Sequence, residues 1–259
     1  MKNDHIKNHW DNQAKLFPES HQASWGDQYC IDLEIEAIRM YLSGTDCLLD
    51  IGCANGLSSL AFLEHGVAHV TGVDFSEEMI AAAEKNSKKR DLEERSVFKV
   101  GDIRNLEFDS DLFRVTNTTR VLINLPTWEE QRKGIDEALR VTIPGGTALF
   151  SEAFYEPLVK LNALREVLGL APLREQEFNF YLSTKKMEQY LNEKGAQFSC
   201  IPISSMYYLG TRIIRELIVE QDQVSEFSND LNATFFDLQR KFTIAKDIGI
   251  QKLYVVTVP

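Results

Sequence analysis

The sequence is poor in paired cysteines and in positive charge. Its four cysteines (Cys30, Cys47, Cys53 and Cys200) form no CxxC pair, so neither a zinc site nor a disulfide framework is indicated. The 28 lysines and arginines are outnumbered by 39 aspartates and glutamates, which gives a formal net charge of -11. Because binding to DNA or RNA rests on neutralising phosphates, this balance disfavours a nucleic-acid partner.

Long apolar runs are also missing. No window approaches the roughly 18 consecutive apolar residues that a bilayer-spanning helix requires, and the opening stretch MKNDHIKNHW lacks the apolar core of a signal peptide. We therefore expect a cytoplasmic protein with no membrane partner. With 259 residues, 44% of them hydrophobic, the chain is long enough to bury the core of one large domain, 1–259.

Two kinds of segment alternate along the sequence. Apolar runs of Val, Ile and Leu alternate with helical patterns, which is typical of βαβ units on a mostly parallel sheet. The fold class predicted is α/β, with a seven-stranded, mostly parallel sheet and helices on both faces. Strands are expected near 47–51, 68–73, 96–100, 112–117, 147–152, 198–207 and 251–258.

Several helix starts are also readable. Ser76, Thr127 and either Ser183 or Thr184 each precede a helical pattern and supply a side-chain oxygen that can cap it. Three segments stand outside the alternation. We interpret 1–30 as an N-terminal lid, with packing as an extra helix the alternative, and 153–182 and 210–248 as helical cap insertions.

The turn after the first strand carries the most specific signal. Its small residues fall at Gly52, Ala54 and Gly56 in the stretch DIGCANG. A phosphate-binding P-loop needs a Gly-Lys pair, which does not follow here. The dinucleotide fingerprint G-x-G-x-x-G needs a small residue where this chain has Leu57.

With these residues the chain resembles the class I S-adenosylmethionine-dependent methyltransferases, whose first motif is an acidic residue, an apolar residue and G-x-G-x-G. Ala54 departs from it at the middle glycine. VTGVDFSEEMI is similar to the second motif, VGDIRNL to the third, and LRVTIPGGTALF to the helix, turn and strand that follow. The resemblance implies a Rossmann-like methyltransferase fold with an antiparallel last strand, and S-adenosyl-L-methionine as cofactor.

The cofactor site can be placed on these motifs. Asp74 lies 22 residues after Gly52, at the carboxyl end of the next strand, where an acidic side chain can accept both ribose hydroxyls. By the same logic Asp102 accepts from the adenine amino group, with Phe75 and Met79 as apolar cover. The predicted cofactor-binding residues are Asp50, Gly52, Cys53, Ala54, Gly56, Asp74, Phe75, Met79, Asp102 and Ile103.

The methyl acceptor is expected beyond the carboxyl ends of the fourth and fifth strands. There the chain has Arg120, which can hold a carboxylate or phosphate, and Glu152, which can accept a proton; both are predicted catalytic residues. The alternatives are a structural salt bridge for Arg120 and, for Glu152, a structural role in fixing the backbone or the cap. A histidine base would have to come from the N-terminal segment. Predicted substrate contacts are Arg120, Asn124, Asn162, Arg165, Asn179, Tyr181, Tyr208 and Arg212.

The leading functional hypothesis is methyl transfer from S-adenosylmethionine to a small polar acceptor, as O-methylation of a metabolite or sugar-bearing intermediate. The alternatives are a non-catalytic cofactor-binding or scaffold protein on the same fold and, opposed by the glycine spacing, an NAD-dependent oxidoreductase. We expect no catalytic metal, although a magnesium site of the catechol type stays open, and a homodimer is possible.

Overall fold

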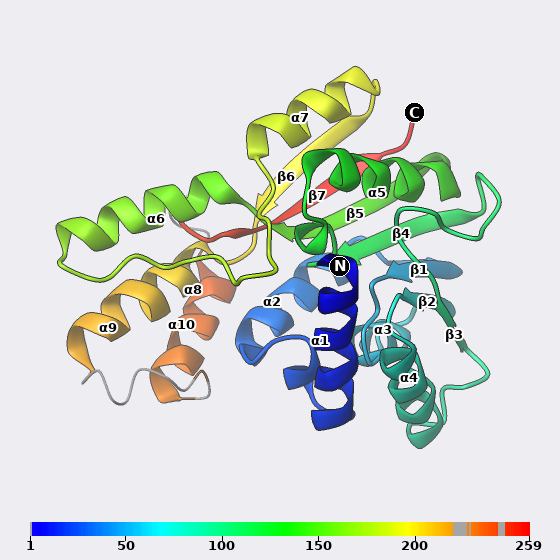
Figure 1. The fold of residues 1–259 in the computed structure, drawn as a ribbon, viewed down its shortest axis with the longest axis horizontal. Coiled ribbons are helices and arrows are strands. Elements are labelled where there is room, and N and C mark those ends of the chain that lie inside the picture. Colours follow the sequence, from blue (N-terminus) through cyan, green and yellow to red (C-terminus); the bar gives the residue numbers. More distant parts are fainter. Residues whose placement is uncertain (1, 220–226, 228, 243–246) are drawn as a thin grey trace.

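A twisted sheet of seven strands forms the centre of the computed structural model (Figure 1). Residues 2–219, 227, 229–242 and 247–259 are described. The strand order is β3-β2-β1-β4-β5-β7-β6. The strands are β1 (Cys47–Ile51), β2 (His69–Asp74), β3 (Ser96–Val100), β4 (Phe113–Thr119), β5 (Thr142–Ala153), β6 (Gln197–Pro202) and β7 (Gln251–Thr257).

The direction of the strands confirms the predicted fold class. Strands β1 to β5 pair in parallel, and β7 runs antiparallel to both β5 and β6. Two boundaries are wrong by five residues: the fifth strand was expected to begin near 147, but β5 begins at Thr142, and the sixth strand was expected to reach residue 207, but β6 ends at Pro202. Proline has no N–H to give to the strand ladder, and a new helix begins three residues later, at Ser205.

Helices cover both faces of the sheet, and three predicted starts are confirmed. Ser76, Thr127 and Ser183 each accept a backbone N–H from the first turn that follows. In Figure 1, α5 and α7 lie on one face and α2, α3 and α4 on the other. The helices up to β5 are α1 (Lys2–Leu16), η1 (His21–Ala23), α2 (Gln28–Arg39), α3 (Leu57–Glu64), α4 (Glu77–Lys89), η2 (Leu122–Asn124) and α5 (Trp128–Val141).

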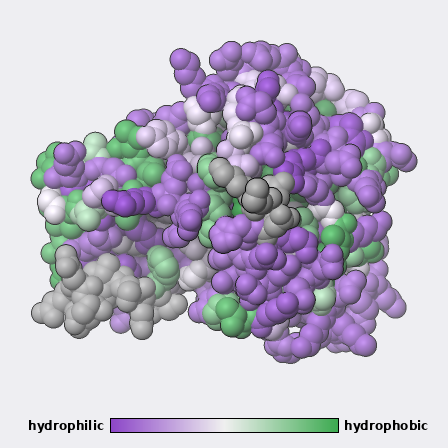
Figure 2. All heavy atoms as spheres, viewed as in Figure 1, coloured by the Kyte–Doolittle hydropathy of each residue, from purple (hydrophilic) through white to green (hydrophobic). Residues whose placement is uncertain are grey.

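The remaining helices build a group beyond the carboxyl ends of the parallel strands (Figure 1). They are α6 (Tyr155–Val167), α8 (Ser205–Leu209), η3 (Gly210–Ile214, a π-helix), α9 (Arg215–Ile218) and α10 (Asp230–Lys241), while α7 (Thr184–Glu193) lies on the sheet. Figure 2 shows a mostly hydrophilic exterior with apolar side chains gathered over α6. No helix among the described residues is both long and apolar enough to cross a bilayer.

The N-terminal segment is fastened to the turn that follows β1. The Asn55 side-chain amide donates to the carbonyls of Pro18 (3.2 Å) and Ser20 (2.9 Å), and Asn86 donates to the Pro18 carbonyl (2.9 Å). Helix α1 then packs along α4, where the Ser76 hydroxyl donates to Asp11. Asn55, to which the sequence assigns no chemistry, is therefore the anchor that holds α1 over the glycine turn.

Replacing Asn55 with alanine tests this anchor. Asn55→Ala removes the donors of several buried carbonyls, so we expect a loss of about 1–3 kcal/mol in the free energy of unfolding, measured by urea titration. Asn192→Ala, at an exposed position of α7, is the control and should change stability by less than about 0.5 kcal/mol. Equal stability of the two variants would contradict the anchor.

Candidate active site

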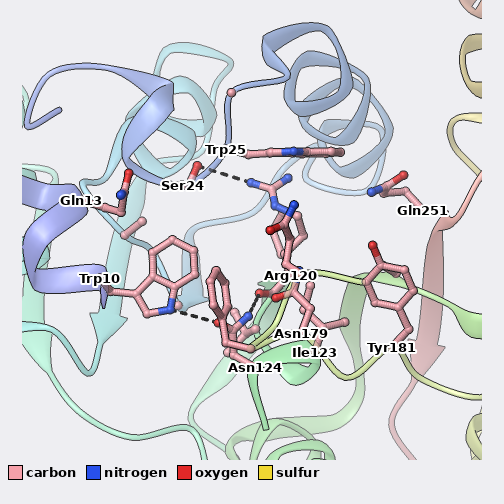
Figure 3. A pocket seen from close by; sticks show the side chains of 18 of the residues that line it. Trp10, Gln13, Ser24, Trp25, Arg120, Ile123, Asn124, Asn179, Tyr181 and Gln251 are labelled. Atoms are coloured by element: carbon pink, nitrogen blue, oxygen red, sulfur yellow. Dashed lines mark hydrogen bonds between the residues drawn. The ribbon is translucent and has the colours of Figure 1, made fainter. Parts of the chain in front are cut away.

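A cavity of about 420 Å³ opens at the carboxyl edge of the sheet, beneath α1. Its wall draws on the turn after β1, the ends of β2, β4, β5 and β7, the N-terminal segment and residues 173–181. Trp10, Trp25, Arg120 and Tyr181 project around it from four different parts of the chain (Figure 3). Two neighbouring cavities join it at Gly52, which lines all three.

The turn after β1 forms the floor of these cavities. Gly52 has φ of +73°, and a Cβ atom there would come within 2.1 Å of the Val121 side chain, so only glycine fits. Ala54, at the position of the middle glycine, also has a positive φ of 48°. Its N–H donates to a carboxylate oxygen of Asp74 (3.0 Å), which ties the turn to the end of β2.

Gly56 does not line any of the three cavities, contrary to its predicted contact with the cofactor. A Cβ atom at this position would lie 2.9 Å from the Ala83 Cβ and 3.1 Å from the Phe98 ring. The glycine is needed because α3 begins here with a φ of +77° and packs closely against α4 and β3. Its role is backbone packing.

Asp74 lies where the sequence predicts it, at the carboxyl end of β2 and on the cavity wall. One carboxylate oxygen accepts the Ala54 N–H and the other accepts the Ser76 N–H (2.9 Å), and each keeps a lone pair for another donor. Burial raises the pKa of Asp74 to about 6, although the two backbone N–H groups lower it. Phe75 and Met79 line the same cavity.

The other predicted cofactor residues divide between the two neighbouring cavities. Asp102 and Ile103 line the second, which Phe75 also borders and Ile6 of α1 covers. The Asp102 carboxylate is held by the Arg104 side chain. Asp50 and Cys53 line the third. Asp50 is buried and accepts from the side chains of Ser59 (2.5 Å) and Asn117 (2.8 Å).

Arg120 reaches the cavity, but its charge is already paired. Its guanidinium donates to the carboxylate of Glu34, which is fully buried on α2, and stacks over Trp25 at 5.1 Å from the ring centre (Figure 3). The backbone at Arg120 adopts φ of +57° at the end of β4. The salt-bridge alternative is therefore the one found, and the arginine is not a free anion-binding group.

Arg212 is paired in the same way. It lies on the π-helix η3, and its guanidinium donates to the fully buried carboxylate of Asp27 at 2.6 Å. The rings of Tyr208 and Phe227 lie 5.0 and 4.9 Å from the guanidinium carbon. Sequence reasoning did not find Asp27 or Glu34, because nothing local marks either residue as the partner of a distant arginine.

Three of the residues predicted for catalysis or substrate binding do not line the cavities. Glu152 is fully buried and accepts from the Thr118 hydroxyl and from the N–H groups of residues 121–123, so it caps η2 instead of facing an acceptor. Burial raises its pKa to about 7. Arg165 is buried against the carbonyls of residues 171 and 212 and pairs with Glu216. Asn162 exchanges hydrogen bonds with the Leu173 backbone.

The other predicted acceptor residues do line the main cavity; they are Asn124, Asn179, Tyr181 and Tyr208. The Asn124 side-chain oxygen accepts the Trp10 indole N–H at 3.0 Å (Figure 3). Among the described residues, the Asn179 side-chain oxygen has no hydrogen-bond partner although it is buried. Gln251, at the start of β7, also faces the cavity and was not predicted, because nothing in its sequence context separates it from other strand residues.

His9 is a further residue on the cavity wall. Its ring packs against those of Phe178 and Trp10, with centroids 4.3 and 4.9 Å apart. Burial and the nearby His5 lower the pKa of His9, so its imidazole is neutral at pH 7. Asp74 is the other residue of this wall, within the described part of the chain, whose side chain can accept a proton near neutral pH.

Comparison with known proteins agrees with this geometry. Residues 48–146, which hold the glycine turn, Asp74 and Asp102, match the methyltransferase domain family. The fold is similar to that of geranyl diphosphate methyltransferase solved in complex with S-adenosylmethionine, with a TM-score of 0.59 at 12% identity over 95% of this chain and 89% of that one. Residues 48–146 thus match a methyltransferase domain, and the comparisons support a class I S-adenosylmethionine-dependent methyltransferase.

Two curated relatives each match part of the chain. The demethylmenaquinone methyltransferase of Clavibacter sepedonicus is 34% identical over 146 residues, 56% of each chain. The ubiquinone biosynthesis O-methyltransferase of Coxiella burnetii is 26% identical over 164 residues, 62% of this chain and 67% of that protein. The chain thus spans about half to two thirds of the length of the relatives it matches.

The residues present fit the family's cofactor, S-adenosylmethionine. Asp74 offers the free lone pairs that two ribose hydroxyls need, and the close approach at Gly52 leaves the main chain open to the ligand. Asp102 and Ile103 border a side cavity that continues from the same floor, as an adenine ring requires. We assign these residues to the cofactor site as a proposal that binding measurements can test.

Protonation of Asp74 provides such a test. The ribose hydroxyls would donate to the ionised carboxylate, so the affinity for S-adenosylhomocysteine should fall as the pH drops below about 6, by up to about tenfold per pH unit. In calorimetry at pH 7.5, Asp74→Asn should weaken binding roughly 10- to 100-fold, whereas the exposed Asp46→Asn should leave it unchanged. A flat pH profile would contradict the role of Asp74.

Proposed function

We propose that this protein transfers a methyl group from S-adenosylmethionine to an oxygen atom of a small polar acceptor. The observation that carries the proposal is the continuity of the cavity. Gly52 and Asp74, assigned to the cofactor, share one cavity with Tyr181, Tyr208 and other polar side chains that no cofactor contact uses. Two relatives, the ubiquinone biosynthesis O-methyltransferase and a 27-O-demethylrifamycin SV methyltransferase of Amycolatopsis mediterranei, also support oxygen as the acceptor atom.

The residues around this cavity have separable roles. S-adenosylmethionine supplies an electrophilic methyl group on a positively charged sulfur. Asp74 and the turn at Gly52 fix the position of that group, and alignment alone can supply much of the rate in an in-line displacement. Trp10 and Trp25 cover the cavity from the N-terminal segment and would exclude water during transfer.

The same segments define the proposed architecture of the site. Residues 1–30 act as the lid, anchored through Asn55, and residues 153–182 and 210–248 cap the acceptor end. Residues 220–226, 228 and 243–246 of the second cap lie outside the described residues. Arg212 and Tyr208, which line the cavity, belong to the π-helix and to α8 at the start of this region.

His9 is the proposed general base in place of Glu152. It is neutral near pH 7, lines the cavity and, among the described residues, has no hydrogen-bond partner on either ring nitrogen. An alcohol needs a proton acceptor as its oxygen bonds to carbon, and a neutral imidazole is suited to that task. In this proposal the N-terminal segment supplies both the tryptophans that cover the cavity and the histidine that accepts the proton.

The proposal as a whole is tested by binding and turnover. Calorimetry should detect S-adenosylmethionine binding at micromolar levels, and radiolabelled methyl groups should appear in an extract of small molecules. Failure to bind the cofactor would overturn the proposal. Tight binding with no turnover on a broad panel of acceptors, in a protein that co-purifies with a stable partner, would favour the scaffold alternative.

The role of His9 is tested by a kinetic split. His9→Gln should lower kcat roughly 100-fold or more with little change in the KM for S-adenosylmethionine, because the cofactor contacts remain. It should also abolish the fall in kcat at low pH that protonation of the imidazole causes. His65→Gln, an exposed histidine after α3, is the matched control. An unchanged kcat would remove His9 from the mechanism.

A further inference from the structure

The acceptor end of the cavity is lined by charges that cancel. Arg120 and Arg212 face it, but each guanidinium is neutralised by a carboxylate that is fully buried, Glu34 and Asp27 respectively. Withdrawing an arginine to serve a bound anion would leave its carboxylate uncompensated in the interior, which is strongly unfavourable. Neither arginine is therefore available as a positive charge for a bound carboxylate or phosphate.

Among the described residues, one other permanently charged cation borders the cavity. Arg174 is exposed, and its side chain lies in water, where a charge interaction contributes little. Within the described part of the chain, the carboxylate on this wall is Asp74, which the cofactor site uses. The balance of charge around the acceptor end thus favours an uncharged molecule.

Hydrogen-bonding groups without partners supply the polarity instead. The Tyr208 side chain is 97% buried, and its hydroxyl has no hydrogen-bond partner among the described residues; the same holds for the Tyr181 hydroxyl. The buried Asn179 oxygen is also unpartnered. Leaving the buried Asn179 oxygen unsatisfied is costly, so a ligand that donates a hydroxyl group to it is favoured, and the two tyrosine side chains line the same cavity. Each tyrosine hydroxyl can donate and accept a hydrogen bond, and the Asn179 oxygen accepts one.

The shape and chemistry of the walls favour a flat ligand. Trp25, Phe178, Tyr181 and Tyr208 present aromatic rings, and Leu158 and Ile250 complete an apolar lining. Aromatic walls bind planar rings by stacking and edge contacts. Because the cavity of about 420 Å³ must also receive part of the cofactor, the space left is that of a small ring system.

We propose that the acceptor is an uncharged aromatic alcohol, a phenol or catechol, held by Tyr181, Tyr208 and Asn179 without an ionic contact. The inference rests on the proposed function. In the transfer step the acceptor oxygen bonds to the methyl carbon, the carbon–sulfur electron pair returns to sulfur, and the hydroxyl proton passes to His9. The two arginines position the wall through Glu34 and Asp27 and bind no part of the acceptor.

Three probes of similar size test the proposal by calorimetry on the protein loaded with S-adenosylhomocysteine. 4-Methylcatechol should bind at least tenfold more tightly than 3,4-dihydroxybenzoate, which differs by a carboxylate, and at least tenfold more tightly than cis-1,2-cyclohexanediol, which is not flat. Equal or tighter binding of the carboxylate would overturn the neutral character of the site. Equal binding of the cyclohexanediol would overturn its preference for aromatic rings.

Two variants sharpen the result. Tyr208→Phe removes one hydroxyl and should weaken 4-methylcatechol roughly three- to tenfold with unchanged S-adenosylhomocysteine affinity, whereas the exposed Tyr155→Phe should change neither. Asp27→Asn releases the charge of Arg212 and should raise the affinity for 3,4-dihydroxybenzoate. If Tyr208→Phe binds 4-methylcatechol as tightly as the unmodified protein does, the proposed contact between Tyr208 and the acceptor is overturned. This result does not depend on whether Asp27→Asn folds.

The outcomes separate this inference from the function on which it rests. If S-adenosylhomocysteine binds but none of the three probes does at millimolar concentration, the acceptor class is overturned and the cofactor-dependent activity stands. If S-adenosylhomocysteine itself does not bind, the proposed function fails together with it.

Discussion

The architecture of the site depends on two buried carboxylates that each hold a distant arginine. Asp27 and Glu34 lie seven residues apart, at the cap and on one face of α2, so both point toward the interior. Asp27 binds Arg212 from η3, and Glu34 binds Arg120 from the end of β4. Because a buried charge is tolerated only when paired, these contacts fix the C-terminal helices and the sheet edge relative to α2.

The pairs also explain why the cavity has its particular character. Each pair neutralises an arginine that lines the cavity. The groups left to contact a ligand there are aromatic rings and hydroxyl groups. Asp27 accepts from the Tyr207 hydroxyl as well (2.6 Å), and Asn232 of α10 donates to that same hydroxyl. The network therefore extends from α2 into α8 and α10, and the wall formed by Tyr208 and Arg212 rests on it.

The features that sequence predicted best are those determined locally. The strands follow from runs of apolar residues, three helix starts follow from a capping side chain, and the cofactor turn follows from glycine spacing next to an acidic strand end. Asp74 was placed correctly because the carboxyl ends of neighbouring parallel strands meet at one edge. The Asn55 anchor, in the same turn, was missed because its partners are backbone carbonyls of residues 18 and 20.

The features that sequence did not predict depend on contacts between remote segments. Arg165 has the spacing of a ligand-binding residue, yet it satisfies backbone carbonyls inside the helical group. Glu152 lies at the carboxyl end of β5, as a catalytic carboxylate would, but the irregular turn after β4 supplies N–H groups that it caps. Gly56 fits the motif, but glycine is required at this position because α4 packs too closely to leave room for a side chain. In each case, tertiary packing determines which groups the side chain or backbone contacts.

The coupling between Asp27 and Arg212 is the most direct test of this account. A double-mutant cycle with Asp27→Asn and Arg212→Met, followed by urea unfolding, isolates the interaction of the pair from the separate effects of each change. The account predicts a coupling of roughly 2 kcal/mol or more, with the double variant more stable than the sum of the single losses implies. A coupling below about 0.5 kcal/mol would show that the arginine is not the counter-ion of this carboxylate and would contradict the neutral cavity.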